Sequence, residues 1–318
     1  MKVVILGKGL MLANLILGAI DAGAEIVGVL RYEQTCTNAV KLLFKELFNP
    51  DYELTLIKQL GLKQLNFKSA NSEAFRKFLV SSNVDLVFVG TWKELIEKKT
   101  FIIPKIGMVN AHPSLLPKYR GPNPYMQTIL HGEKVSGVTL HLMDSRYDGG
   151  AILSQQKVEI LETDTSKELR EKSVIAARGL VSQLICDLNN KIITPIPQSE
   201  KHASYYVNIT GEEKMLDFTM QTSVEIYRTI KALHPFLPCY ITHRNKFFIV
   251  NPYEVNILRN SFNAQKGVII AKDSKSRSLT LVCADGVAIR FDNLKLYGAG
   301  FFTSFYIEKF ISLNHDQA

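Results

Sequence analysis

Short apolar runs alternate with helix-like segments along roughly the first 150 residues, and this alternation constrains the fold more than any other feature. The runs cover residues 3–6, 26–30, 85–89, 107–109 and 138–143. Strands that are separated by helices form right-handed crossovers and a mostly parallel sheet. The sequence therefore predicts an α/β domain whose ligands bind at the carboxyl ends of the strands.

The pattern changes after a long predicted helix at residues 165–189, which opens with the capping sequence Thr165-Ser166-Lys167-Glu168. Prolines and polar residues follow at 193–206, and this composition favours an extended linker. We therefore expect a first domain at residues 1–192, the linker at 193–206, and a second domain at 207–318.

The second domain is predicted to contain one amphipathic helix, at residues 223–233, followed by short strands with polar turns between them. The strands are expected at residues 240–243, 247–250, 268–271, 279–283 and 287–291. A small antiparallel β-barrel of the OB type is the natural candidate for such a series.

Composition indicates a folded protein, with 46% hydrophobic and 21% charged residues, and we expect it in the cytoplasm. The net charge of +8 is shared between both halves, so neither is strongly basic. The chain starts with a strand and not a secretion signal, and the apolar run at 10–20 is too short to span a bilayer. We therefore expect no membrane partner. No cysteine or histidine spacing is typical of a metal site, so we also expect no metal.

A cluster of polar residues follows the predicted strand at 107–109. Asn110 and His112 are two residues apart, so both side chains point to the same side of an extended backbone. An amide and an imidazole can both donate to a carbonyl oxygen that gains charge. Asp148, on a glycine turn, supplies a carboxylate that would orient the imidazole. Together, the three residues suit acyl transfer.

These residues belong to a longer pattern of Asn-x-His-x-Ser-Leu-Leu-Pro, then Arg-Gly, Gly-Val-Thr and Asp-x-Gly. The pattern resembles the signature of the folate-dependent formyltransferases, which implies a Rossmann-like domain that holds 10-formyltetrahydrofolate. In the mechanism that it implies, Asn110 and a protonated His112 stabilise the oxyanion while Asp148 helps to remove the proton of the attacking amine. The residues implied to contact the reduced folate are Ser114, Leu115, Leu116 and Pro117.

The likeness extends into the second domain, where residues 230–236 and 216–218 resemble parts of the methionyl-tRNA formyltransferases. This implies that the acceptor is the methionyl amine of initiator methionyl-tRNA. Those enzymes carry a basic loop where residues 31–65 of this chain are more apolar. The segment has a helical spacing of Val40, Leu43, Phe44, Leu47 and Phe48.

The apolar character of residues 31–65 favours a second acceptor, a nucleotide-linked amino sugar. Two readings of another class remain, a non-catalytic tRNA-binding protein on a decayed enzyme fold and a hydrolase that releases formate from the folate. A dinucleotide site at Gly7-Lys8-Gly9 is disfavoured, because Leu12 stands at the third glycine position and Arg31 replaces the acidic ribose ligand.

Overall fold

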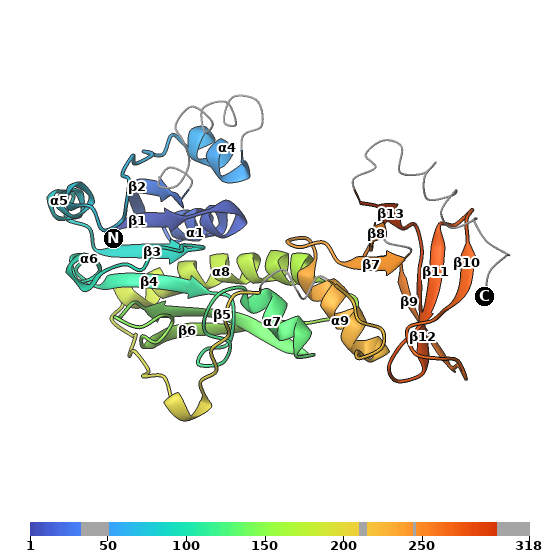
Figure 1. The fold of residues 1–318 in the computed structure, drawn as a ribbon. Helices are drawn as coiled ribbons and strands as arrows, with labels where there is room; N and C mark the ends of the chain where they lie inside the picture. The colour runs from blue at the N-terminus through green and yellow to red at the C-terminus, as the bar shows by residue number, and fades with distance from the viewer. Residues whose placement is uncertain (33–50, 210–214, 244–245, 298–318) are drawn as a thin grey trace. The chain divides into compact units, whose positions relative to one another are not determined.

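The computed structural model describes residues 1–32, 51–209, 215–243 and 246–297, and Figure 1 traces the chain. The chain divides into two compact units. Unit 1 contains residues 1–124, 134–160 and 169–207, and unit 2 contains residues 125–133, 161–168 and 208 onward. The chain therefore passes between the units more than once, whereas we expected a single passage at the linker.

Unit 1 contains a six-stranded sheet with the order β2-β1-β3-β4-β5-β6 (Figure 1). The strands are β1 Lys2–Gly7, β2 Glu25–Arg31, β3 Leu86–Gly90, β4 Gly107–His112, β5 Val135–Leu142 and β6 Ile152–Glu159. The pairings from β2 to β4 are parallel, and those of β4 with β5 and of β5 with β6 are antiparallel. The predicted mostly parallel α/β sheet is confirmed.

Strand β6 was not predicted. It lies at the edge of the sheet, and Gln155, Gln156 and Lys157 at its centre are exposed, so it lacks a continuous apolar run. An edge strand with polar side chains is compatible with solvent on one side, and composition alone does not distinguish it from a loop.

The core of unit 1 lies on both faces of the sheet. Its helices are α1 Gly9–Asp21, α4 Tyr52–Gln59, α5 Glu73–Ser81, α6 Lys98–Phe101 and α8 Ser166–Asn189. On one face, Val4 and Leu6 of β1 join a buried cluster with Phe75 and Leu79 of α5. The side chain of Ser72 caps α5 by accepting from the amide of Phe75 at 3.2 Å. Alternation along β1 directs Val3 and Ile5 to the opposite face.

Residues 193–206, which we expected to form a linker, belong to unit 1. The backbone of Ile196 exchanges two hydrogen bonds of 2.8 Å with Ile152 of β6. The backbone of Arg120 forms a parallel bridge with the segment, donating to the Ser204 carbonyl at 2.9 Å and accepting from the Tyr206 amide at 3.0 Å. The exposed edge of β6 provides the unpaired groups that bind Ile196.

Unit 2 contains helices α7 Pro124–Leu130 and α9 Ser223–Leu233 and two antiparallel sheets, with the orders β10-β11-β12-β9 and β13-β8-β7. The strands are β7 Tyr240–His243, β8 Lys246–Ile249, β9 Val255–Ser261, β10 Ile269–Asp273, β11 Ser278–Val282, β12 Val287–Phe291 and β13 Lys295–Leu296. The expected helix and all five expected strands are present, while β9 and β13 are additional. Thr222 and Glu225 form a capping box at the start of α9.

The predicted amphipathic helix at Val40 to Phe48 lies outside the described residues. Within the part of the chain that the structure describes, no helix combines the length and apolar character needed to cross a bilayer.

Candidate active site

Strand β4 positions the first two predicted site residues. Asn110 is half-buried and His112 is only 5% exposed, and both lie near the carboxyl end of the strand. The antiparallel register with β5 places His141 directly opposite Asn110. His141 is a site residue that sequence reasoning missed, because its position depends on the direction and register of a neighbouring strand.

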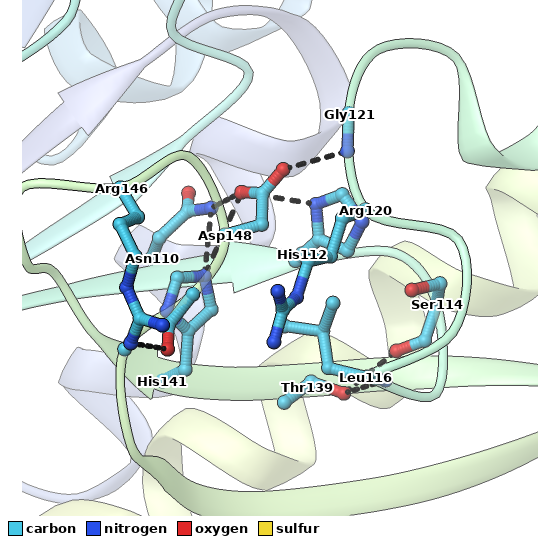
Figure 2. Close-up of polar contacts among 12 residues, drawn as sticks. Asn110, His112, Ser114, Leu116, Arg120, Gly121, Thr139, His141, Arg146 and Asp148 are labelled. Atoms are coloured by element: carbon cyan, nitrogen blue, oxygen red, sulfur yellow. Dashed lines mark hydrogen bonds and ion pairs between the residues drawn. The ribbon is translucent and has the colours of Figure 1, made fainter. Parts of the chain in front are cut away.

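Asp148 lies in the connection between β5 and β6 and reaches the same point (Figure 2). Its Oδ1 accepts a hydrogen bond from Asn110 Nδ2 at 3.2 Å and lies 3.5 Å from His112 Nδ1. Its Oδ2 accepts from the backbone amide of Gly121 at 2.9 Å. The structure thus brings together Asn110, His112 and Asp148, from segments 36 residues apart in sequence.

His141 completes the cluster. Its Nε2 lies 3.2 Å from Asn110 Nδ2 and 3.7 Å from Asp148 Oδ1. Its Nδ1 lies 2.8 Å from the carbonyl oxygen of Leu142, which requires a hydrogen on Nδ1. In the neutral ring Nε2 is then an acceptor, so both hydrogens of the Asn110 amide are engaged, by Asp148 and by His141.

The electrostatic environment keeps Asp148 ionised. Burial alone would raise its pKa, but the His112 ring, the His141 side chain and the Gly121 amide outweigh burial and hold the pKa well below its usual range. Burial lowers the pKa of His112, against the opposing effects of Asp148 and of the Tyr119 carbonyl. Both nitrogens of the His112 ring face oxygen atoms, since Nε2 lies 2.8 Å from the Tyr119 carbonyl.

Two glycines let the segments around Asp148 approach closely. Gly121 has φ +95°, and a Cβ there would overlap the carbonyl oxygen of Tyr206. A Cβ at Gly150 would overlap the carbonyl oxygen of Leu142. The glycines of the Arg-Gly and Asp-x-Gly patterns are therefore needed for the geometry of the cluster.

Comparisons with known proteins agree with this geometry. A family model described as formyl transferase matches residues 1–183, and one described as formyl transferase, C-terminal domain, matches residues 208–300. The chain belongs to the formyltransferase family. The predicted membership is confirmed.

The relatives of this formyltransferase include a methionyl-tRNA formyltransferase from Enterococcus faecalis, 28% identical over 314 residues, with 98% of this chain and 95% of the relative covered. Another, from Bacillus velezensis, is 31% identical over 223 residues, covering 70% of this chain and 68% of the relative. Among solved structures, an N-formyltransferase from Helicobacter canadensis matches with TM-score 0.65 and 18% identity, covering 93% of this chain and 100% of that chain. At 18% identity, the likeness to the Helicobacter canadensis structure shows that the two proteins share a fold.

The predicted folate-contacting segment, Ser114 to Pro117, is fixed by hydrogen bonds to two neighbouring strands. Thr139 of β5 donates to the Ser114 carbonyl at 2.7 Å and accepts from the Leu116 amide at 3.1 Å. Gln155 of β6 donates to the Leu116 carbonyl at 2.7 Å. Ser114 and Leu116 are buried, and Leu115 and Pro117 are half-buried. In this formyltransferase the segment is therefore tied to β5 and β6.

A hollow borders Asn110, His141 and Asp148 on the side away from that segment. Its other lining residues come from the end of β3 and from the connection after β5, and they are Val89, Trp92, Glu94, Leu95, Met143, Asp144, Arg146 and Tyr147. The indole nitrogen of Trp92 is buried there without a hydrogen-bond partner among the described residues. The hollow combines aromatic and apolar walls with a few polar groups, as small-molecule sites do, but its volume of about 50 Å³ holds only part of such a ligand.

The glycine turn after β1 binds a carboxylate of the protein itself. The amide of Gly9, at the start of α1, donates to Glu53 Oε1 at 2.9 Å, and Glu53 is 2% exposed. A buried carboxylate thus occupies an amide that a phosphate would need in a dinucleotide site. Among the described residues, no group of three or more His, Cys, Asp or Glu side chains could hold a metal ion.

Proposed function

We propose that this formyltransferase transfers a formyl group from 10-formyltetrahydrofolate to the methionyl amine of initiator methionyl-tRNA. The observation that supports the acceptor most is the span of the likeness. The Enterococcus faecalis relative matches 98% of this chain, so it resembles both units and not the catalytic part alone.

Two observations support a reduced folate as the donor. The Helicobacter canadensis structure, which shares the fold, contains folinic acid. In this chain the hollow beside Asp148 offers the side chains of Trp92, Leu95 and Met143 to a flat heteroaromatic ring. The segment Ser114 to Pro117 stays a predicted folate contact, now with a backbone fixed by Thr139 and Gln155.

In the proposed mechanism, the neutral amine attacks the formyl carbon next to Asn110 and His112. The carbon–nitrogen bond to the acceptor forms as the carbonyl oxygen gains negative charge. Donors aimed at that oxygen typically contribute a factor of about 100 to 1000 in rate. Because both hydrogens of the Asn110 amide are engaged in the free protein, we propose that substrate displaces the contact with Asp148 or with His141.

The proton of the amine passes to the leaving nitrogen of the folate through Asp148 and His112. We expected His112 to be protonated from the start, but burial lowers its pKa, so we propose a neutral ring in the free protein. The ionised Asp148 carboxylate, 3.5 Å from Nδ1, stabilises the ring when it receives the proton. The proton then moves to the folate nitrogen as its bond to the formyl carbon breaks, which leaves the chain unchanged.

A nucleotide-linked amino sugar is the second candidate acceptor. The Helicobacter canadensis structure contains dTDP-3-aminofucose, and this chain covers 100% of that protein. In addition, Arg31, the first residue of the unusual segment 31–65, is fully buried and forms an ion pair with Asp51 at 3.2 Å. A buried and paired arginine does not contact RNA phosphates.

One experiment tests the proposal and its alternatives. The purified protein is incubated with 10-formyltetrahydrofolate and either methionyl-tRNA or a dTDP-linked amino sugar, with His112→Ala as the inactive control, and the formylated amine is identified by mass spectrometry. Formyl-methionyl-tRNA is the expected product. A formylated sugar alone would overturn the tRNA assignment. Formate release without an acceptor would indicate a hydrolase, and tRNA binding without transfer would indicate a decayed enzyme.

A further inference from the structure

The turn that carries Asp148 is held from outside by side chains. Asp148 has φ +51°, a left-handed conformation that is unfavourable for a residue with a Cβ. The carbonyl oxygens of three consecutive residues, Asp148, Gly149 and Gly150, each accept a hydrogen bond from a side chain. Strained backbone of this kind persists where surrounding contacts over-determine it.

Gln198 supplies two of these three bonds. Its Nε2 donates to the Asp148 carbonyl at 2.8 Å and to the Gly150 carbonyl at 2.7 Å. Its Oε1 accepts from two nitrogens of the Arg120 guanidinium, Nε at 3.1 Å and Nη2 at 2.9 Å. Every polar atom of the Gln198 side chain is therefore engaged, between the turn on one side and Arg120 on the other.

Arg146 supplies the third bond, and Glu200 links Arg146 to Arg120, the partner of Gln198. Arg146 donates to the Gly149 carbonyl at 2.8 Å, and both Arg146 and Arg120 bind Glu200 at 2.9 Å. Arg120 is 8% exposed, so this arginine is held in one place by two partners of the segment 193–206. Arginine suits this task because its planar fork binds a carboxylate and an amide oxygen together.

The same segment fixes the other side of the cluster. Ser204 accepts the amides of Arg120, through its carbonyl at 2.9 Å, and of Tyr119, through its hydroxyl at 2.9 Å. Tyr119 and Gly121 in turn bind the ring of His112 and the carboxylate of Asp148. The segment thus contacts both loops that meet at the Asp148 side chain.

We propose that the segment 193–206, acting through Gln198 and Arg120, is a positioning element that holds the Asp148 carboxylate at His112 during formyl transfer. This inference rests on the proposed function for its catalytic consequence. None of its residues needs to touch substrate. A misplacement of about 1 Å in such a site can lower the rate on the order of 100-fold.

The test compares Gln198→Ala with Gln198→Glu. The first removes all four bonds, whereas the second keeps an oxygen for Arg120 and loses the donors to the turn. Gln183→Ala is the matched control, because Gln183 donates to Asp187 at 2.7 Å on an exposed face of α8, away from the cluster. We expect both Gln198 variants to lower kcat on the order of 10- to 100-fold with less than about a threefold change in KM for the folate, and the control to resemble wild type.

A second readout does not depend on turnover. The ring of His112 is titrated by NMR in the wild type and in each variant, and melting temperatures verify that each protein is folded. Because the Asp148 carboxylate raises the pKa of His112, against burial, displacement of Asp148 should lower that pKa further in the Gln198 variants alone. A His112 titration in Gln198→Ala that matches wild type overturns the inference, whatever the acceptor is. If the wild type transfers no formyl group while the His112 pKa still falls in the variants, the proposed function fails and the positioning element stands.

Discussion

Removal of the His141 ring should lower kcat, although the three predicted catalytic residues, Asn110, His112 and Asp148, all remain. His141 is 2% exposed, and its Nε2 is an acceptor for Asn110 Nδ2 at 3.2 Å. In His141→Ala the amide of Asn110 keeps Asp148 as a partner and loses the second contact that fixes its plane. A buried polar group that loses its partner typically costs about 1–3 kcal/mol.

If that cost falls on the alignment of Asn110 in the transition state, kcat falls by about 10- to 100-fold, since about 1.4 kcal/mol corresponds to a factor of ten. His141→Gln should recover part of the loss, because an amide oxygen can accept from Asn110 in place of the ring nitrogen. His131→Ala is the control. The His131 ring binds the carbonyl of Gln127, four residues earlier in the chain, at 2.7 Å.

The pH dependence gives a second measure with a defined sign. Burial, and to a smaller extent the charge of His141, lower the pKa of His112, the group that must be neutral to receive the proton. Without the ring that pKa rises, so the acid limb of the kcat profile should move to higher pH in His141→Ala. Single-turnover transfer to methionyl-tRNA between about pH 4.5 and 8, on both sides of the ordinary pKa of histidine, measures both effects. An unchanged rate, or an acid limb that moves to lower pH, would refute the argument.

Three further outcomes are expected. Asn110→Ala and His112→Ala should each lower kcat by at least about 100-fold, measured by formyl transfer at saturating substrate, and turnover at wild-type levels would contradict their roles. Gly150→Ala should lower the melting temperature and the activity together, because its Cβ would overlap the Leu142 carbonyl. Asp148→Asn should remove an acid-dependent part of the unfolding free energy. The folded pKa of Asp148 is depressed, so its contribution is present above about pH 4 and lost as pH falls, and urea unfolding at pH 7 and at low pH measures that slope.

Much of the fold follows from local pattern. The apolar runs of β1, β2 and β3 and the helix α9 are each specified by residues within one short window. Strand β6 and the segment 193–206 are different, because their residues are polar and each is ordered by pairing, β6 with the preceding strand β5 and the segment with residues far away in the chain. Prolines and polar side chains typical of a linker are equally compatible with a segment that pairs to a sheet edge, and sequence alone does not separate the two.

The site shows the same division between local and distant information. Asn110 and His112 share one side of one strand, so their proximity could be predicted from the strand alone. Asp148 was predicted because the imidazole needs a carboxylate to orient it and because of the family resemblance, and its distance to His112 could not be known before the fold. His141 and Gln198 were missed, because the first depends on the register between β4 and β5 and the second on a side chain that binds backbone carbonyls 48 and 50 residues away.

The reversal of direction at β5 explains why the cluster forms where it does. If the strand after β4 were parallel to it, the carboxyl end of that strand would lie beside His112. The loop after that strand would then leave from the edge of the sheet where β4 ends. Because β5 is antiparallel, His141 pairs with Asn110, and the chain after Leu142 turns back as β6. That return creates the tight connection on which Asp148 lies, and it also leaves β6 as the free edge that the segment 193–206 pairs with. One change of strand direction thus supplies the acceptor for Asn110, the turn for the carboxylate, and the edge that anchors the segment holding that turn.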